Sequence, residues 1–208
     1  MAASLEPLVR TQMLLRDVNE RIAEVARSWQ AGPPAFLCEC SDTDCTETLS
    51  LGEYEHIRSS PNLFVIHRNH EHPDVDRVLQ VNDRFALVEK TKHTDLVPSW
   101  QRDAPGKGGS GMDFETMDGR RNQREFRHAN GRFHAVLTAA SGPDGQLIPF
   151  LCECADAECQ GSVDITTRRY GDIHVHERDY VILPGHMRIA GEEIMEENSY
   201  YEIVRKTA

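Results

Sequence analysis

Apolar side chains recur every three or four positions near the start of the chain, with arginine and acidic residues between them. That spacing is typical of an amphipathic α-helix. The apolar positions are Leu8, Met13, Leu15, Val18, Ile22, Val25 and Ala26. We therefore expect a helix over residues 5–29.

Shorter apolar segments follow, bounded by proline, glycine and polar residues. Their patterns predict strands and short helices. For the first half we expect strands over 48–51, 63–67 and 84–90, a short helix over 52–60, and a helix or helical turn over 74–81. For the second half we expect helices near 122–140 and 167–175, strands over 162–166, 179–183 and 200–206, and a turn over 191–197. Helices combined with short sequential strands indicate an α+β fold.

The chain repeats itself, and the strongest sign is a cysteine motif. Residues 36–45 read Phe-Leu-Cys-Glu-Cys-Ser-Asp-Thr-Asp-Cys, and residues 150–159 read Phe-Leu-Cys-Glu-Cys-Ala-Asp-Ala-Glu-Cys. The similarity extends upstream, where 15–22 aligns with 126–133, and downstream, where Tyr54 aligns with Tyr170. We expect two tandem copies of one small domain of about 80 residues. Each copy is a leading helix, a short mainly antiparallel sheet and one or two short helices.

Composition places the boundaries of the two copies. Residues 103–112 are rich in glycine, which is typical of a flexible tether. We expect a first repeat over residues 1–93, a flexible linker over 94–118 and a second repeat over 119–208.

Charge and hydropathy limit the partners and the cellular compartment that we expect for the protein. The formal net charge is −11, which disfavours nucleic-acid binding because the phosphate backbone attracts lysine and arginine. The local exception is an arginine-rich helix, for which we favour a solvated surface: Arg120, Arg121, Arg124, Arg127 and Arg132. The sequence shows neither a membrane span nor the apolar centre of a signal peptide, so we expect a cytoplasmic protein. In that compartment thiols stay reduced, so clustered cysteines indicate metal ligands rather than disulfides.

All six cysteines lie in the two motifs, so each copy offers three thiolates and needs a fourth ligand to close a tetrahedral site. The first copy offers His67, His70 and His72. Of these, only His70 aligns with a histidine of the second copy, His186. We therefore expect two metal sites, formed by Cys38, Cys40, Cys45 and His70, and by Cys152, Cys154, Cys159 and His186.

Three thiolates and one imidazole suit zinc, so we expect two zinc ions per chain. Iron is the lesser alternative, because the ferredoxin spacings are absent. The cysteines could instead be buried apolar residues, but Glu39, Asp42 and Asp44 give the loop a polar character. His174 and His176 could form a further metal site, although surface histidines at a helix end are the simpler interpretation.

The donor set favours structural over catalytic zinc, because a catalytic zinc keeps an open position and a Cys3His set leaves none. A small domain with a thin core also gains from a metal. We expect an interaction or regulatory module that binds a macromolecule, more readily a protein than a nucleic acid, with no catalytic residue assigned. The alternatives are a zinc-dependent hydrolase with an open coordination position and a thiol-based redox or zinc sensor.

The sequence also resembles an uncharacterised family of small bacterial proteins, especially from actinobacteria. The resemblance rests on Phe-x-Cys-Glu-Cys-x4-Cys, Glu-Tyr-Glu-x-Ile-Arg at 53–58, Pro-Gly-His at 184–186 and Val-Glu-Lys at 88–90. It covers most of both halves and implies a bacterial cytoplasmic setting. The first copy departs from Pro-Gly-His, where it reads Arg68-Asn69-His70.

Overall fold

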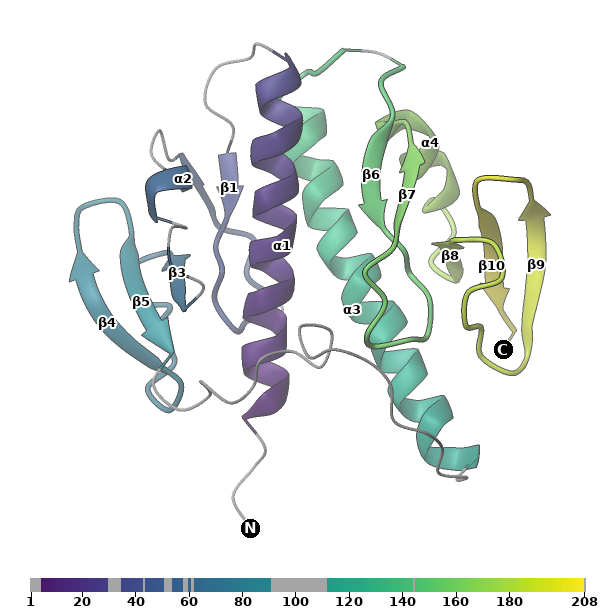
Figure 1. The fold of residues 1–208 in the computed structure, drawn as a ribbon, viewed down its shortest axis with the longest axis horizontal. Helices are drawn as coiled ribbons and strands as arrows, with labels where there is room; N and C mark the ends of the chain where they lie inside the picture. The colour runs from purple at the N-terminus through teal and green to yellow at the C-terminus, as the bar shows by residue number, and fades with distance from the viewer. Residues whose placement is uncertain are drawn as a thin grey trace. The chain divides into compact units, whose positions relative to one another are not determined.

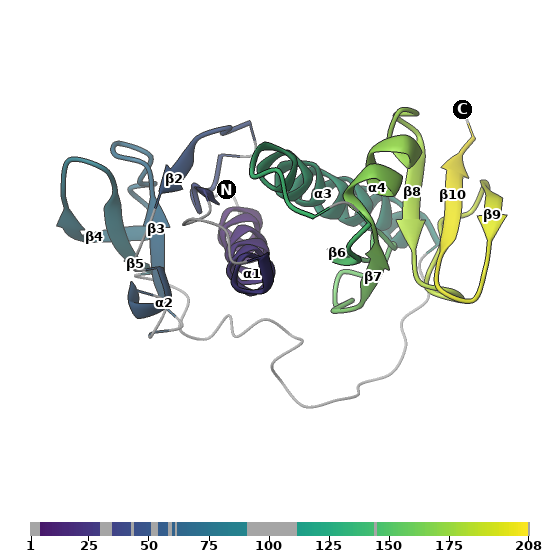
Figure 2. The ribbon, with the colours of Figure 1, turned by 90° about the horizontal axis from the view of Figure 1, so that it is seen from above.

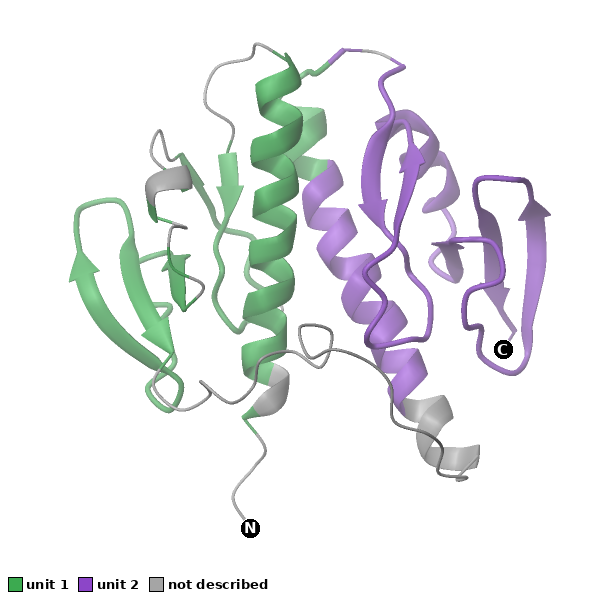
Figure 3. Ribbon diagram, in the orientation of Figure 1, with its two compact units in different colours: residues 1–97, 135–142 green, residues 98–134, 143–208 purple. Residues whose placement is uncertain are grey.

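The computed structural model describes residues 5–29, 35–42, 44–50, 54–57, 60, 62–90, 112–143 and 145–207. The chain divides into two compact units (Figure 3). Unit one comprises residues 1–97 and 135–142, and unit two comprises residues 98–134 and 143–208. Of the tether expected over 94–118, residues 94–111 lie outside the described residues, and residues 112–118 belong to a helix.

The same order of elements occurs twice along the chain, which is compatible with a duplicated domain (Figure 1). The first series is α1 (Glu6–Trp29), β1 (Ala35–Leu37), β2 (Thr48–Ser50), α2 (Tyr54–Ile57), β3 (Leu63–Ile66), β4 (Asp76–Val81) and β5 (Ala86–Lys90). The second is α3 (Met112–Ala139), β6 (Ile148–Leu151), β7 (Ser162–Ile165), α4 (Thr167–Ile173), β8 (Asp179–Ile182), β9 (Glu192–Glu197) and β10 (Glu202–Lys206). The predicted α+β class is confirmed.

The two series also share their sheet topology. A two-stranded antiparallel sheet, β1–β2 or β6–β7, precedes a three-stranded antiparallel sheet in the order β3–β5–β4 or β8–β10–β9. In each three-stranded sheet the last strand of that series, β5 or β10, is therefore the central one, and β4 or β9 forms an edge (Figure 2).

Two of the predicted elements are wrong, and both concern these edges. Residues 74–81 were expected to be helical and 191–197 to form a turn, whereas β4 and β9 are strands. Each strand carries a bulge, at Leu79 and at Met195, where the pairing register shifts. A bulge inserts one residue and breaks the period of two. Apolar residues then fall at adjacent positions, and the spacing of Val75, Val78 and Leu79 imitates a helix face.

Smaller differences occur before the cysteine motifs and at the start of α3. The strands β1 and β6 were not predicted. Helix α3 begins at Met112, before the expected start near residue 122. Residues 112–118 contain no glycine or proline after the glycine-rich segment, so nothing in the backbone chemistry stops the helix earlier.

The core of unit one lies between α1 and the two small sheets. Leu15, Val18 and Ile22 on α1 are at most 2% exposed, and each contributes on the order of 1.5–3 kcal/mol by burial. The three cysteines of the motif belong to the same core and pack with strand residues of β3 and β5 and with Met13. The strand residues are Phe64, Ile66, Ala86 and Val88. The three thiols are therefore part of the hydrophobic core of unit one and do not lie on an exposed loop.

A network of buried polar side chains connects the first helix to the first three-stranded sheet. The ammonium group of Lys90 donates to Gln12 Oε1 and to Asp76 Oδ1. Asp76 also accepts hydrogen bonds from the amide of Gln12 at 3.3 Å and from the backbone N–H of His72 at 2.8 Å. This network connects α1 to both β4 and β5.

In the second unit, Gln123 and Lys206 align with Gln12 and Lys90, but they do not form the same hydrogen-bond network. Gln123 is fully buried, and within the described ranges neither its amide oxygen nor its amide nitrogen has a hydrogen-bond partner. The ammonium group of Lys206 lies 4.0 Å from the centre of the Tyr180 ring. Burial lowers the pKa of Lys206 to about 8.

We expect the stability of the protein to rise with pH because of Lys206. Between about pH 8 and the ordinary lysine pKa of 10.5, the unfolded chain binds a proton at Lys206 that the folded chain does not. Folding then releases a proton, so a higher pH favours the folded state. Urea unfolding at several pH values in this window should show a positive slope that Lys206→Met reduces. An unchanged slope in that variant would show that other groups produce it.

Candidate metal centres

A tight loop after β1 or β6 gathers the three cysteines of each motif. The backbone N–H of Cys45 donates to Asp42 O, and that of Cys159 donates to Asp156 O, both at 3.3 Å. Each aspartate also accepts, through its side chain, the backbone N–H two residues later at 2.9 Å. Such Asx turns are typical of aspartate. The turn directs the chain back, so that the third thiol faces the first two.

The fourth residue of each set follows β3 or β8 after a left-handed backbone position. Asn69 has φ 65° and Gly185 has φ 73°, and each directly precedes a histidine of the set, His70 or His186. Glycine adopts this conformation freely, and asparagine is among the residues that tolerate it best. This explains how Arg68-Asn69-His70 can replace Pro-Gly-His without changing the path of the chain.

The structure brings together both predicted sets of four residues. In each set one Sγ or ring nitrogen atom per residue lies within 4.8 Å of the others. Nδ1 of His70 lies 3.6 Å from Cys38 Sγ and 3.5 Å from Cys45 Sγ. In the second set Nδ1 of His186 lies 3.6 and 3.4 Å from the first and third thiols. A tetrahedral zinc with bonds of about 2.3 Å to sulfur and 2.0–2.1 Å to nitrogen requires a sulfur–nitrogen edge of about 3.5 Å. Both sets could hold such a metal ion.

Hydrogen bonds among the thiols favour the thiolate form of one cysteine in each set and the protonated form of the first cysteine. Backbone N–H groups of His67 and Leu183 donate to the first thiol of each set at 3.1 and 3.2 Å. A hydrogen bond from Cys38 lowers the pKa of Cys40 to about 5, and hydrogen bonds from the neighbouring thiols lower the pKa of Cys159 to about 2. The lowered pKa favours a thiolate at one position of each set, and a metal ion would displace the remaining thiol protons.

Between the first two cysteines of each motif lies a glutamate that is buried, which the sequence did not predict. Glu39 is 1% exposed. Its carboxylate accepts hydrogen bonds from Asn19 Nδ2 at 2.9 Å, from the hydroxyl of Tyr54 and from the backbone N–H of Val65 at 2.8 Å. The expectation that Glu39 makes the loop polar is therefore wrong, because its carboxyl group faces the interior.

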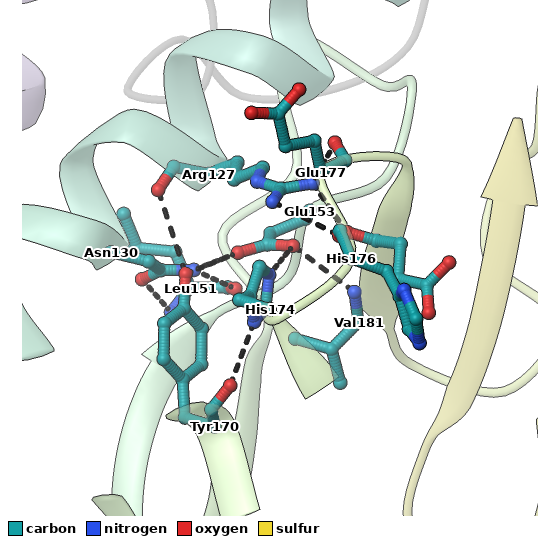
Figure 4. A network of polar contacts seen from close by, with 10 residues as sticks. Arg127, Asn130, Leu151, Glu153, Tyr170, His174, His176, Glu177 and Val181 are labelled. Carbon is teal, nitrogen blue, oxygen red and sulfur yellow. Dashed lines mark hydrogen bonds and ion pairs between the residues drawn. The ribbon is translucent and has the colours of Figure 1, made fainter. Parts of the chain in front are cut away.

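The second motif places Glu153 in the same way (Figure 4). It accepts hydrogen bonds from Asn130 Nδ2 at 3.0 Å, the hydroxyl of Tyr170 at 2.9 Å and the backbone N–H of Val181 at 3.0 Å. Burial and the charge of Glu153 raise the pKa of Tyr170 well above its ordinary value, so that the hydroxyl stays a donor. A buried carboxylate that is saturated with donors fixes the loop that carries two of the thiols.

The asparagine of each network also binds the strand before the motif. Asn19 donates to Leu37 O at 2.9 Å and accepts from Leu37 N at 2.7 Å. Asn130 makes the same pair of hydrogen bonds with Leu151, at 2.8 and 2.9 Å. The leading helix, the first strand and the metal loop are thus connected through one side chain in each unit.

In unit two a histidine, His174, also contacts the buried glutamate, and this contact has no described counterpart in unit one. Nε2 of His174 lies 2.9 Å from Glu153 Oε2, and Nδ1 lies 2.9 Å from the backbone carbonyl of Tyr170 (Figure 4). Both ring nitrogens of His174 are therefore engaged in hydrogen bonds within unit two. The side chain is 10% exposed, which corrects the interpretation of His174 as a surface residue. His176 is exposed, as expected.

The arginine-rich segment lies on α3 and is partly committed to packing. Arg127 donates to backbone carbonyls at the start of β8, including that of Asp179 at 2.7 Å, and its guanidinium lies 5.2 Å from the centre of the Tyr180 ring. Arg132 is 9% exposed. The exposed members are Arg120, Arg121 and Arg124. Two of the five arginines are therefore not presented to solvent as a binding surface.

No protein-family model, curated protein or solved structure matches the chain in the three comparisons. The resemblance to an actinobacterial family therefore stays a prediction. Among the described helices, none combines the length and apolar character that a bilayer crossing requires.

Removing the tyrosine hydroxyl from the network should destabilise unit two. Tyr170→Phe deletes one donor to Glu153 but keeps the ring, which stacks on Phe150 at 4.1 Å. We expect a loss of about 1–2 kcal/mol in the free energy of unfolding, measured with urea. Tyr200→Phe is the matched control, because Tyr200 is 75% exposed, and should change nothing measurable. Equal effects of the two variants would contradict the role of the network.

Proposed function

We propose that the protein is a two-site zinc protein in which both metal ions hold the fold, and that it acts through its surface as an interaction or regulatory module. The observation that carries this proposal is the closed donor set. Each site offers three thiols and one imidazole nitrogen within 4.8 Å of one another. Four protein ligands complete the tetrahedral shell of a structural zinc.

Zinc is favoured over iron by the ligand atoms and by their spacing. The nitrogen–sulfur separations of 3.4–3.6 Å match the edges of a tetrahedron around a single zinc ion. Iron–sulfur clusters use other cysteine spacings and need room for inorganic sulfide. A single zinc ion per site is therefore the simplest occupant.

A structural role is favoured over catalysis and over redox sensing by burial. Five of the six cysteines are buried, and Cys159 is half-buried. A hydrolytic zinc needs an open position for water, which four protein ligands deny. A redox-sensing thiol must be reached by its oxidant, which the buried cysteines disfavour. The polar residues around the motifs, Asn19, Glu39 and Tyr54 and their counterparts, are occupied in fixing the loops.

Metal analysis combined with chelation tests this proposal. Elemental analysis of the purified chain should give two zinc ions and no stoichiometric iron. A strong chelator should remove both and abolish the folded circular dichroism signal, because structural zinc contributes on the order of 10–16 kcal/mol to such domains. A metal-free chain that keeps its full folded signal and its cooperative unfolding would overturn the structural role.

A further inference from the structure

The three-stranded sheet of unit two has one covered edge and one open edge. The outer side of β8 is covered by the metal loop, where Glu153 N donates to Val181 O at 2.9 Å and Leu183 N donates to Cys152 Sγ at 3.2 Å. On the other side of the sheet, β9 pairs with β10 alone among the described strands (Figures 1 and 2). The outward backbone groups of such an edge can pair with another extended chain.

The side chains of β9 give this edge a distinct chemistry. Ile194 is 40% exposed and Met195 is 47% exposed, so two apolar side chains are available at the bulge. Four of the six strand residues are glutamates: Glu192, Glu193, Glu196 and Glu197. Glu196 is bound by Arg169 at 2.5 Å, and Glu193 lies opposite Arg205 of β10, which is itself bound to Asp179; Glu193 and Glu197 are exposed. The edge is therefore acidic with an apolar centre.

The equivalent edge of unit one has the same geometry without the charge. Strand β4 carries exposed apolar residues at the aligned positions, with Val78 at 42% and Leu79 at 47% exposure. Its acidic residue, Asp76, is buried against Lys90, and Arg77 forms an ion pair with Glu89. The chain thus contains a nearly neutral edge that is a natural control for the acidic one.

We propose that β9 is a docking edge for an extended, lysine- or arginine-containing segment of a partner protein, which adds to the sheet as a fourth strand. Main-chain hydrogen bonds to the edge would supply affinity, and side chains alternating between basic and apolar would match the glutamates and the Ile194–Met195 pair. A second copy of the chain is a poor occupant, because pairing of two β9 strands would bring eight glutamates together. This inference rests on the proposed interaction role and names its surface.

The experiment uses the zinc-loaded full chain, labelled with 15N, and two capped hexapeptide probes. One probe alternates lysine and valine, and the other alternates glutamate and valine. We expect the lysine probe to shift the amide resonances of β9 but not those of β4, and its affinity to fall severalfold when the salt is raised from about 50 to 200 mM. The glutamate probe should shift neither strand.

Charge reversal sharpens the test. The double variant E193K/E197K should bind the lysine probe at least about tenfold more weakly and gain binding of the glutamate probe. The matched control, Gln80→Glu on β4, should leave binding at β9 unchanged. Absence of β9 shifts, equal shifts on β4, or unchanged binding by the double variant would overturn the proposal. So would shifts of β9 that depend on protein concentration without a probe, because they indicate self-pairing.

Zinc content and circular dichroism are measured on the same samples. A chain that holds two zinc ions and is folded but does not bind the probe refutes the docking edge and leaves the structural zinc sites intact. A chain that lacks zinc and is nevertheless folded refutes the zinc proposal, whatever its probe binding.

Discussion

Replacement of Cys152 by serine should reduce the zinc content from two ions per chain to one and unfold most of unit two. Serine is a far weaker zinc ligand than a thiolate, and the remaining three groups no longer close the shell. The core of this small unit then loses an apparent binding energy on the order of 10–16 kcal/mol, which exceeds the stability of most domains. Native mass spectrometry gives the metal count, and amide spectra show which strands remain folded.

The corresponding variant of the first metal site provides the control. Cys38→Ser should remove the other zinc ion and collapse the resonances of β3, β4 and β5 while those of β8, β9 and β10 persist. Retention of two zinc ions by either variant would contradict the assignment of the ligands. Collapse of both units in each variant would contradict the expectation that each zinc site supports its own unit.

Replacement of Glu153 by alanine should destabilise unit two by about 3–5 kcal/mol even with zinc present. Asn130, Tyr170 and the backbone N–H of Val181 would each lose a buried acceptor. His174 would lose the carboxylate beside its Nε2. Urea unfolding of the zinc-loaded chain measures the change.

Two further variants separate this effect from general damage to the loop. Glu153→Gln keeps the shape and one acceptor oxygen, so about 1–3 kcal/mol should be lost. Glu158→Ala removes an exposed carboxylate from the same loop and should lie within about 0.5 kcal/mol of the parent chain. If Glu153→Ala were as stable as Glu158→Ala, the buried network would have no structural role.

The fourth residue of each metal set could be predicted because the motif occurs twice. Of three nearby histidines only His70 has an aligned histidine, and the structure places Nδ1 of His70 beside the thiols. A single copy could not have made that choice, because the histidine follows the motif at a long distance. The long helix α1 was also predictable, since its apolar residues keep one period over 24 residues.

Strands β4 and β9 were not predictable from periodicity, because their bulges shift the alternation by one residue. The buried glutamates were missed for a different reason. A glutamate between two cysteines is typical of a solvated loop in sequence. Its burial becomes evident only from the hydrogen-bond partners that the fold places around it. A signal was nevertheless present, because Asn19 and Tyr54 align with Asn130 and Tyr170, and all four bind the glutamate of their own unit.

The most direct test of closed structural sites is the coordination of the bound zinc, measured by X-ray absorption at the zinc edge on a chain that holds two ions. We predict three sulfur atoms at about 2.3 Å and one nitrogen atom at about 2.0–2.1 Å around each zinc. Fewer than three sulfur atoms per zinc, or an oxygen atom from water in the shell, would contradict closed sites and favour an open, catalytic centre.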